Sequence, residues 1–449
     1  MVVIDISVQI TNYCPPGLGS PFMPQSGRPY LPRPVGYPGH SIASVLTLRA
    51  QPLVFNAMPR RRIALVTPIL PMPYDQTRGR FIYETAKSLS KLADVKVFLP
   101  QARYPKLSML RPRTYVYGDL SENYSLPDLD VDAFSYTALP VVSRGLNGVV
   151  SSRQLTPRIR AFKPDIVIGY WVYPDGHAAL RSARALGIPC VIGALGSDIH
   201  VRQGINTVMT RHTLKQADSV VVVSDAMRHY TADKYGTQAD KIHVIVNGFN
   251  TEVFQLRDRQ TARLALNIPD DSEVIAYVGR FIEAKGLIEL VTSFGEMCRT
   301  RPKLRLALIG SGVLEDRLKA LLSEKQLLDK VFLPGGLQPT QVAQWLAASD
   351  VLTLPSWSEG YPNVVVEGVA CGRPVVATDV GGTREILHEG NGILIPPKNV
   401  EALTRALTQA LDTNWDHQAI ANGIRRSWDD VASETLGVCE KLLQKAERK

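Results

Sequence analysis

Short apolar segments alternate with helical segments along most of this 449-residue chain, and that alternation limits its fold more than any other feature. From Ile63 onward the strand-like segments are short and continuously apolar, as in Cys190–Ala194 and Val274–Val278. Strands of this kind are buried on both faces, and the helices between them are the crossovers that a parallel sheet requires. Residues 101–163 are less regular. The sequence therefore predicts an α/β fold built from parallel sheets.

Two such sets of segments follow one another in the chain. The alternation loosens around residues 255–272, which we interpret as a linker, and a chain of this length exceeds one ordinary core. We therefore expect two doubly wound, Rossmann-like domains that face a central cleft, at residues 58–260 and 261–427. Residues 428–449 are helical and amphipathic, and we expect this C-terminal helix to pack back on the N-terminal domain.

Residues 1–57 differ in composition from the rest of the chain. They contain nine prolines and one Asp, and neither Lys nor Glu. Because no segment there shows the apolar periodicity of a helix or a strand, the stretch is poorly suited to form a hydrophobic core. We expect a disordered or non-native extension, and an overextended reading frame with the folded protein starting at Met58 would account for it.

Composition narrows the classes of function. The formal net charge of +9 favours anionic partners. Nucleic acid is disfavoured as a partner because the sequence holds no zinc-finger or basic-zipper pattern. The five cysteines include no Cys-x-x-Cys pair, which is typical of a reducing cytoplasm and argues against a zinc site. No apolar run approaches the ~20 residues of a membrane span. We therefore expect a cytoplasmic protein.

Two carboxylates, Glu359 and Glu367, stand on either side of a Gly-Tyr-Pro turn. Glu359 falls in a loop after an apolar strand, and Glu367 falls in the helix that Pro362 introduces. Backbone N–H groups at such a loop-to-helix junction favour an anion, and carboxylates accept hydrogen bonds from sugar hydroxyls. The pattern indicates a site for a polyhydroxylated ligand. The junction adds three candidate binding residues, Gly360, Asn363 and Val364.

A second junction carries two cations. Gly279 and Arg280 end a predicted strand, and Lys285 and Gly286 open the next helix. Two fixed positive charges beside the free N–H groups of a helix N-terminus are suited to a diphosphate. We expect Arg280 and Lys285 to bind one, with Gly279 at the turn.

Together these motifs resemble those of retaining glycosyltransferases with the GT-B fold, in particular glycosyltransferase family 4 (glycosyl transferases group 1). The resemblance covers roughly residues 60–445. Glu359 and Glu367 are similar to the family's Glu-x7-Glu signature, and Gly279–Gly286 is similar to its Gly-Arg and Lys-Gly turn. The resemblance implies a hexosyltransferase that moves a hexosyl unit from a UDP- or GDP-linked sugar to a polysaccharide, glycolipid or lipid-linked acceptor of the cell envelope.

The resemblance also implies a role for each charged residue. Glu367 holds the ribose, Glu359 holds hydroxyls of the donor sugar, and Arg280 and Lys285 stabilise the charge on the leaving diphosphate. No nucleophile is apparent, so the resemblance implies departure and attack on one face of the sugar, with configuration retained. No Asp-x-Asp pair stands beside a predicted sheet end, and no metal or other cofactor is expected.

Further glycine turns resemble the family pattern. Gly310-Ser311-Gly312 is similar to its Gly-x-Gly turn, where the backbone approaches the nucleotide. Gly381-Gly382-Thr383-Arg384-Glu385 is similar to its Gly-Gly-x-x-Glu turn near the donor sugar. These turns add donor-binding candidates at Gly310, Gly312, Gly381, Gly382 and Thr383.

In the N-terminal half, Gly79 and Arg80 stand where the family has a glycine-rich loop bordering the donor phosphate and the acceptor. Many relatives carry a His-bearing loop after the strand that corresponds to Cys190–Ala194, and here Asp198 is the candidate for a catalytic sugar or acceptor contact. His177 is expected to face the cleft. Gly79, Arg80 and His177 are thus the acceptor-side candidates.

Two other functions remain open from the sequence. A nucleotide-sugar 2-epimerase of the same architecture would need acid and base carboxylates and histidines in the cleft. A non-catalytic subunit would bind the nucleotide sugar without transferring its hexosyl unit. Assays of donor hydrolysis and of transfer separate these functions.

A basic segment, Arg103–Arg113, carries four cations and several apolar residues but no acid. Clusters of this kind are attracted to anionic lipid surfaces. We expect peripheral contact with an anionic membrane at the inner face of the plasma membrane, where a lipid-linked acceptor would be met.

Overall fold

The structure is a computed structural model, and it describes residues 60–73, 75–103, 124–138, 145–200 and 203–448. The predicted extension at residues 1–57 lies outside these ranges. Most of the basic segment Arg103–Arg113 lies outside them as well, since only Arg103 is described.

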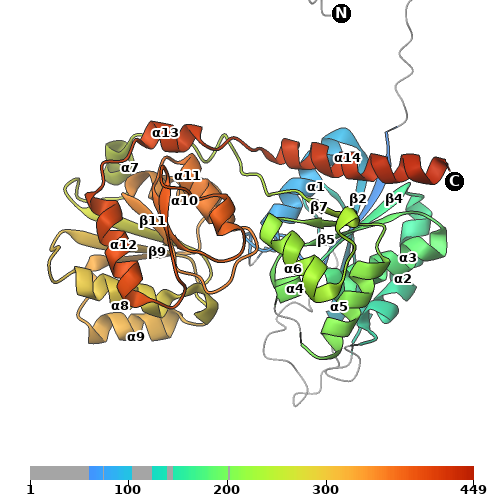
Figure 1. The fold of residues 1–449 in the computed structure, drawn as a ribbon, viewed down its shortest axis with the longest axis horizontal. Coiled ribbons are helices and arrows are strands. Elements are labelled where there is room, and N and C mark those ends of the chain that lie inside the picture. The colour runs from blue at the N-terminus through green and yellow to red at the C-terminus, as the bar shows by residue number, and fades with distance from the viewer. Residues whose placement is uncertain (1–59, 74, 104–123, 139–144, 201–202, 449) are drawn as a thin grey trace, which may run out of the picture. The chain divides into compact units, whose positions relative to one another are not determined.

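The described residues of the N-terminal half form one parallel sheet with the strand order β3-β2-β1-β4-β5-β6-β7 (Figure 1). The chain runs outward from β1 in one direction through β2 and β3, and then in the other direction from β4, so the order reverses between β1 and β4. The strands are β1 Arg62–Val66, β2 Asp94–Arg103, β3 Asp130–Thr137, β4 Ile166–Tyr170, β5 Cys190–Ala194, β6 Ser219–Val222 and β7 Ile242–Val244.

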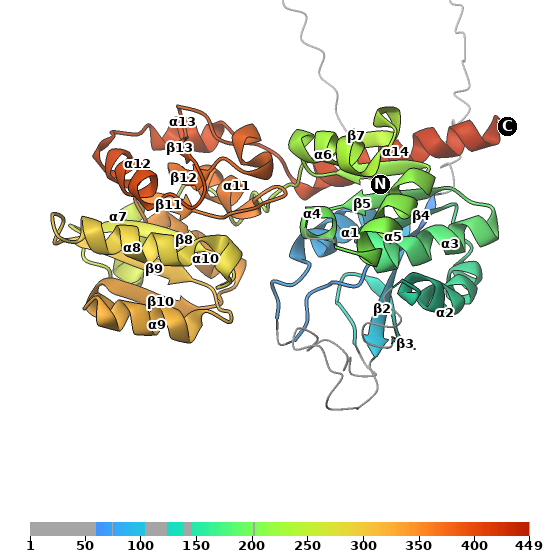
Figure 2. The same cartoon turned by 60° about the horizontal axis from the view of Figure 1, so that its bottom comes forward.

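Helices cover both faces of this sheet. Alternate residues of a strand point to opposite faces, so Ile63 and Leu65 pack with α1 and α14, whereas Ala64 and Val66 pack with α2, α3 and α5. The helices are α1 Arg80–Leu92, α2 Asn147–Phe162, α3 His177–Leu186, α4 Ser197–His200, α5 Ile205–Gln216, α6 Asp225–Tyr235 and, from the end of the chain, α14 Trp428–Glu447. In Figure 2 helices α2, α3 and α5 lie side by side.

Two elements in the less regular region escaped the sequence analysis. Strand β3 is at the sheet edge and only partly buried, so it lacks a continuous apolar run. Helix α2 contains Pro157 and has no acidic residue in its first turn, so the usual start signals are missing.

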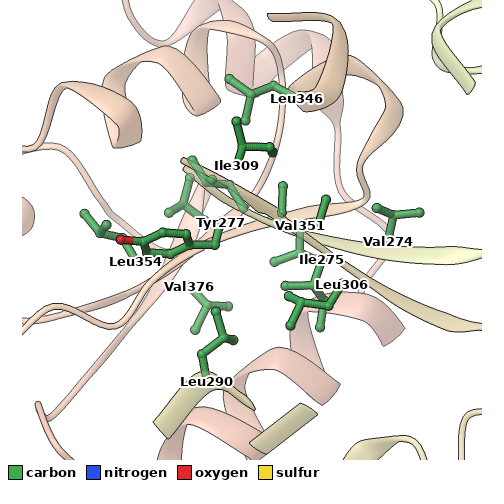
Figure 3. Close-up of a cluster of buried hydrophobic side chains, with 14 of the residues drawn as sticks. Val274, Ile275, Tyr277, Leu290, Leu306, Ile309, Leu346, Val351, Leu354 and Val376 are labelled. Atoms are coloured by element: carbon green, nitrogen blue, oxygen red, sulfur yellow. The ribbon is translucent and has the colours of Figure 1, made fainter. Parts of the chain in front are cut away.

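The C-terminal half forms a second parallel sheet, with the order β10-β9-β8-β11-β12-β13 among its described strands. Its core is one continuous cluster across the strands, and the close-up labels Val274, Ile275, Leu306, Val351 and Val376 among its buried side chains (Figure 3). The strands are β8 Glu273–Val278, β9 Leu304–Ile309, β10 Val331–Gly335, β11 Val351–Leu354, β12 Val375–Thr378 and β13 Gly392–Ile395. The prediction of an α/β fold with parallel sheets is confirmed.

The helices of the C-terminal half are α7 Arg259–Ala265, α8 Leu287–Met297, α9 Glu315–Glu324, α10 Pro339–Ala348, α11 Asn363–Ala370, α12 Val400–Asp412 and α13 His417–Asn422. Helix α7 corrects the expectation of a loose linker at residues 255–272. Asp258 caps its N-terminus, and Arg263 is buried with an ion pair to Asp350 at 2.7 Å between Nη2 and Oδ2. That pair ties α7 to the start of β11.

Candidate active site

The loop between β11 and α11 carries both carboxylates of the first motif. Pro362 is the N-cap residue of α11, and Val365, Val366 and Val369 bury one face of the helix against the core. Glu367 is on the opposite, partly exposed face. The buried valines therefore fix the direction in which Glu367 points.

Lys285 and Glu359 form an ion pair, with 2.5 Å between Nζ and Oε1. Both side chains are largely buried, at 18% and 11% exposure. They meet because β8 and β11 are adjacent at the point where the strand order reverses, which is where open α/β sheets bind ligands. The structure thus brings the cationic turn and the carboxylate loop together, although the two residues are far apart in sequence.

A glycine makes this approach possible. Gly286 has a φ of 66°, and a Cβ there would lie 2.0 Å from the carbonyl oxygen of Pro355. Any larger residue would push the turn that carries Lys285 away from the loop that carries Glu359.

Arg280 is exposed on the same turn, and its guanidinium forms no ion pair within the described residues. Its carbonyl oxygen accepts a hydrogen bond from the Tyr277 hydroxyl at 3.0 Å, which fixes the backbone. A free guanidinium on a fixed backbone, close to the paired Lys285, is available for an anionic ligand.

Burial raises the pKa of Glu367 to about 7, and the charge of Arg80 opposes part of this rise. Arg80 lies in α1, in the N-terminal half, where its Nε is 2.7 Å from Oε1 of Glu84. The charge of Arg80 therefore acts on the carboxyl group of Glu367, which belongs to the other half of the chain. A carboxyl group with a pKa near 7 is a typical feature of a functional site.

The Gly-x-Gly turn packs against the cationic turn. A Cβ on Gly310, whose φ is 144°, would lie 1.9 Å from the carbonyl oxygen of Gly279, and a Cβ on Gly312 would lie 2.5 Å from that of Phe281. These glycines therefore let the turns after β8 and β9 touch. That packing explains them without a ligand, and their contact with a donor stays a prediction.

The Gly-Gly turn is likewise packed on the carboxylate loop. A Cβ on Gly381, whose φ is 55°, would lie 2.1 Å from the carbonyl oxygen of Glu359, and the N–H of Gly382 donates to Gly360 at 2.8 Å. Thr383 is buried and its hydroxyl donates to the carbonyl of Val380. The turn therefore supports the loop that holds Glu359.

Contacts to the N-terminal half surround the same loop. Gly360 lies against Gly196, and the side chain of Asn363 accepts a hydrogen bond from Asn247 at 2.8 Å. Beyond the Gly-Gly turn, the Glu385 carboxylate accepts hydrogen bonds from the backbone N–H groups of Asp225 and Ala226, both at 3.0 Å. A carboxylate at the first turn of α6 is favoured by the helix dipole. The sequence analysis did not single out Glu385 as a site residue, though it ends the Gly-Gly-x-x-Glu pattern.

Asp198 is buried beside the loop after β5, and its predicted contact with a sugar or acceptor stays a prediction. Its side chain is fully buried, and its carboxylate accepts hydrogen bonds from the backbone N–H groups of Leu195 at 2.9 Å, Gly196 at 2.8 Å and Val172 at 3.3 Å. A carboxylate used in this way holds a loop in place.

The side chain of His177 is buried within the N-terminal half, and its predicted acceptor-side role stays a prediction. Its Nδ1 is 3.0 Å from the Thr213 hydroxyl, and burial lowers its pKa to about 4.

Gly79, with a φ of 61°, is the N-cap residue of α1, and a Cβ there would meet the carbonyl of Ile69 at 2.5 Å. Gly79 therefore shapes the loop that precedes Arg80. Val364, a candidate of the C-terminal half, is partly exposed in the first turn of α11.

Within the described part of the chain, no cluster of His, Cys, Asp and Glu residues is arranged to hold a metal ion. No helix of that part is both long enough and apolar enough to span a bilayer.

Comparison with known proteins places these features in context. Residues 258–426 match the family model described as glycosyl transferases group 1, and residues 79–253 match the model described as glycosyltransferase family 4. The chain is 27% identical over 370 residues to the putative teichuronic acid biosynthesis glycosyltransferase TuaC of Bacillus subtilis, covering 80% of this chain and 90% of the relative.

One further relative and one solved structure are informative. A D-inositol 3-phosphate glycosyltransferase of Acidothermus cellulolyticus is 31% identical over 304 residues, covering 62% of this chain and 67% of the relative. The structure of Anabaena HepE in complex with UDP and glucose superposes with a TM-score of 0.65 at 18% identity, covering 85% of this chain and all of HepE. This likeness confirms the predicted fold class, two Rossmann-like domains of the GT-B type.

Proposed function

Because this chain belongs to the GT-B glycosyltransferases, we propose that it is a retaining hexosyltransferase of the family 4 type, using a nucleotide sugar as donor. The observation that carries the proposal is the Lys285–Glu359 ion pair, which joins the two sequence motifs at the point where the strand order reverses. One turn supplies cations for a diphosphate, and the loop beside it supplies carboxylates for hydroxyl groups.

Each charged residue then has a place along an extended donor. Arg280 and Lys285 bind the diphosphate, Glu367 accepts hydrogen bonds from the ribose hydroxyls, and Glu359 accepts them from the donor sugar. A uridine diphosphate donor is supported by the complex of HepE with UDP and glucose. The hexosyl unit goes to a glycan or lipid-linked acceptor.

The chemical step needs charge stabilisation more than a nucleophile. When the bond between the anomeric carbon and the diphosphate oxygen breaks, negative charge develops on the diphosphate, next to Arg280 and Lys285. Fixed cations stabilise such a transition state more than the ground state. The acceptor hydroxyl attacks the same face of the sugar, and its proton passes to the departing diphosphate oxygen, so the configuration is retained.

Glu359 has a second role in the free enzyme. A lysine and a glutamate that are this far buried are each costly when unpaired, so the pair holds Lys285 in position before the donor arrives. A bound diphosphate would give Lys285 a second anionic partner and leave Glu359 able to accept from sugar hydroxyls. We also infer that the two cations take over the neutralising role that a divalent metal has in other phosphate sites.

A panel of nucleotide sugars tests the proposal, first by thermal shift and then by transfer to added glycan acceptors in EDTA. A donor present at 100 times its Kd should stabilise the protein by about 2.7 kcal/mol. The matched pair of variants is Lys285→Ala, which should lose both shift and transfer, and Arg299→Ala, an exposed cation of the same domain, which should keep both. No shift with any nucleotide sugar, or full activity in Lys285→Ala, would refute the proposal.

The acceptor side includes a proposed membrane contact at the basic segment Arg103–Arg113. Changing Arg103, Lys106, Arg111 and Arg113 to Ser should weaken sedimentation with anionic liposomes. Equal sedimentation of this variant and the wild type would show that the segment does not contact the membrane.

A further inference from the structure

A cavity of about 810 Å³ lies in the C-terminal half, at the end of the sheet opposite the candidate active site. Glu273 begins β8, Asp350 directly precedes β11 and Arg373 lies two residues before β12, so these cavity residues mark the amino ends of the strands. The candidate active site lies beyond the carboxyl ends, where β11 leads to Glu359. The cavity is therefore separate from the donor-side residues, and its volume is typical of a small-molecule site.

Three of the arginines that line this cavity share a single carboxylate. Asp350 pairs with two of them, with 2.7 Å from its Oδ2 to Nη2 of Arg263 and 2.5 Å from its Oδ1 to Nη1 of Arg259. Its Oδ2 also accepts a hydrogen bond from the backbone N–H of Val274 at 2.7 Å. The charge of Asp350 is thus already divided between two guanidinium groups, before that of Arg373 is counted.

Arg373 lacks an anionic partner of its own. It is 2% exposed, it lines the cavity, and it forms no ion pair within the described chain. Its Nε donates to the carbonyl oxygen of Cys371 at 3.1 Å and its Nη1 to that of Ser349 at 2.9 Å, whereas its Nη2 has no hydrogen-bond partner among the described residues. Burial lowers the pKa of this guanidinium, and the charges of Arg259 and Arg263 act in the same direction. Because a buried cation without a counter-charge is costly, an anion in the cavity would stabilise it.

Four other carboxylates line the cavity, and each already has a partner. The pairs are Glu273 with Arg301, Asp271 with Lys303, Asp258 with the backbone N–H of Thr261, and Asp270 with the side chain of Gln260. All but Glu273 are exposed, so solvent and salt screen their charges. Arg263 and Arg373 are buried, so the inner part of the cavity is positively charged.

An aromatic side chain supplies another part of the lining. Trp415, in the loop between α12 and α13, is partly exposed, and its Nε1 donates to the carbonyl oxygen of Ala410 at 2.8 Å, which fixes the ring. Leu256 and Leu411 add apolar surface. A fixed indole near guanidinium groups is suited to a ligand that has a ring and a phosphate, since the ring stacks and the phosphate takes up the charge.

We propose that this cavity is a second ligand site, which binds a small phosphate monoester through Arg373 and Arg259 and stacks the ring of that ligand on Trp415. A phosphate is favoured over a carboxylate because its three terminal oxygens can accept from two guanidinium groups at once. The ligand would contact the far end of α11, the helix of Glu367, because the C-cap residue Cys371 accepts the hydrogen bond from Arg373. The inference does not rest on the proposed function, since the cavity lies at the other end of the sheet.

Isothermal titration of the full-length protein with adenosine 5′-monophosphate tests the site. The monophosphate should bind with a Kd below about 1 mM, and inorganic phosphate and adenosine should each bind about tenfold more weakly, because each keeps only one of the two contacts. Arg259→Gln should weaken binding of the monophosphate about tenfold or more, since a charge-assisted contact is lost. The matched control is Arg317→Gln, an exposed cation of α9, which should bind as the wild type does. Trp415→Leu should reduce the affinity for the monophosphate to that for inorganic phosphate.

Two results of this titration would overturn the proposal. One is no binding of the monophosphate up to about 10 mM, and the other is an equal Kd in Arg259→Gln and the wild type. Inorganic phosphate that binds as tightly as the monophosphate would assign the cavity to the free ion and overturn the monoester.

A further set of measurements separates this site from the donor site. Arg373→Lys keeps the charge but loses the planar fork, so it should weaken binding of the monophosphate about tenfold, and Arg259→Gln decides if this buried variant does not fold. Saturating UDP should not displace the monophosphate, and Arg280→Ala with Lys285→Ala should bind it as the wild type does. Displacement by UDP, or loss of binding in that double variant, would place the phosphate in the donor site and overturn the proposal. Intact binding of the monophosphate without a thermal shift from any nucleotide sugar would refute the proposed function alone.

Discussion

The strand-end loops of the two sheets use their carboxylates differently. After β11, in the C-terminal half, Glu359 pairs with a lysine side chain, and the carboxyl group of Glu367 has no hydrogen-bond partner within the described chain. After β5, in the N-terminal half, the carboxylate of Asp198 is fully buried and occupied by backbone N–H groups. The carboxylate of Asp198 therefore holds a loop, whereas the carboxylates after β11 are the ones that we propose to meet a ligand, and the type of hydrogen-bond partner distinguishes the two groups.

The largest effect should come from removing both cations of the donor side. Arg280→Ala with Lys285→Ala should lower turnover about 10²–10⁴-fold, because each charge-assisted contact contributes about 1.5–3 kcal/mol. Steady-state kinetics with a saturating donor measure it. Arg299→Ala together with Lys319→Ala, two cations outside the site, is the control. Turnover unchanged in the site variant would mean that this half does not hold the diphosphate.

Replacing Asp198 should lower the stability of the fold and leave donor binding unchanged. Asp198→Ala leaves buried backbone N–H groups without an acceptor, so we expect a loss of about 3 kcal/mol in the free energy of unfolding. Chemical denaturation measures this loss, and isothermal titration at low temperature measures donor affinity, which should be unchanged. A variant as stable as the wild type but unable to transfer would instead return Asp198 to the catalytic residues.

The sequence predicted the donor half better than the acceptor half, for a physical reason. Strand-to-helix turns such as Gly279–Gly286 are local, and their cations, glycines and helix starts lie within a few residues. The bounds of α6 carry local signals as well, namely the Ser224 side chain that caps Met227 N–H and Gly236 at the C-terminal end. Elements without such signals, β3 and α2, were missed.

Pairings between distant segments were beyond the sequence analysis. The Lys285–Glu359 pair depends on β8 and β11 being neighbours, which only the strand order establishes. The burial of His177 was hidden for the same reason, since the neighbouring Thr213 belongs to α5, a separate helix. Local chemistry thus identifies which residues are suited to a ligand, and tertiary packing decides which of them are free to bind it.

The pH dependence of donor binding should sharpen the assignment of Glu367. Its pKa is raised to about 7, so it is mostly protonated at pH 6 and mostly ionised at pH 8. Only the ionised carboxylate accepts hydrogen bonds from both ribose hydroxyls, so the Kd of the donor should fall about tenfold as the pH rises from 6 to 8. Isothermal titration measures this, and Glu367→Gln should flatten the profile. A profile that is equally steep in Glu367→Gln would assign the titration to another group.

The smallest effect should come from the contact that joins the two halves at Glu385. Glu385→Gln keeps one acceptor oxygen but removes the charge at the first turn of α6, so the backbone N–H groups of Asp225 and Ala226 lose about 0.5–1 kcal/mol of interaction. Because we propose that the donor binds to the C-terminal half, its affinity should not change. Transfer needs both halves, so we expect kcat to fall about twofold to fivefold, with donor Kd and melting temperature nearly constant. Arg384→Gln, on the neighbouring exposed residue whose partner is Asp379 in the same half, is the control. If Glu385→Gln weakened donor binding as much as transfer, the contact would act within the donor site. The contrast between ligand-binding carboxylates in one half and loop-holding carboxylates in the other, drawn from Glu359 and Asp198, would then fail.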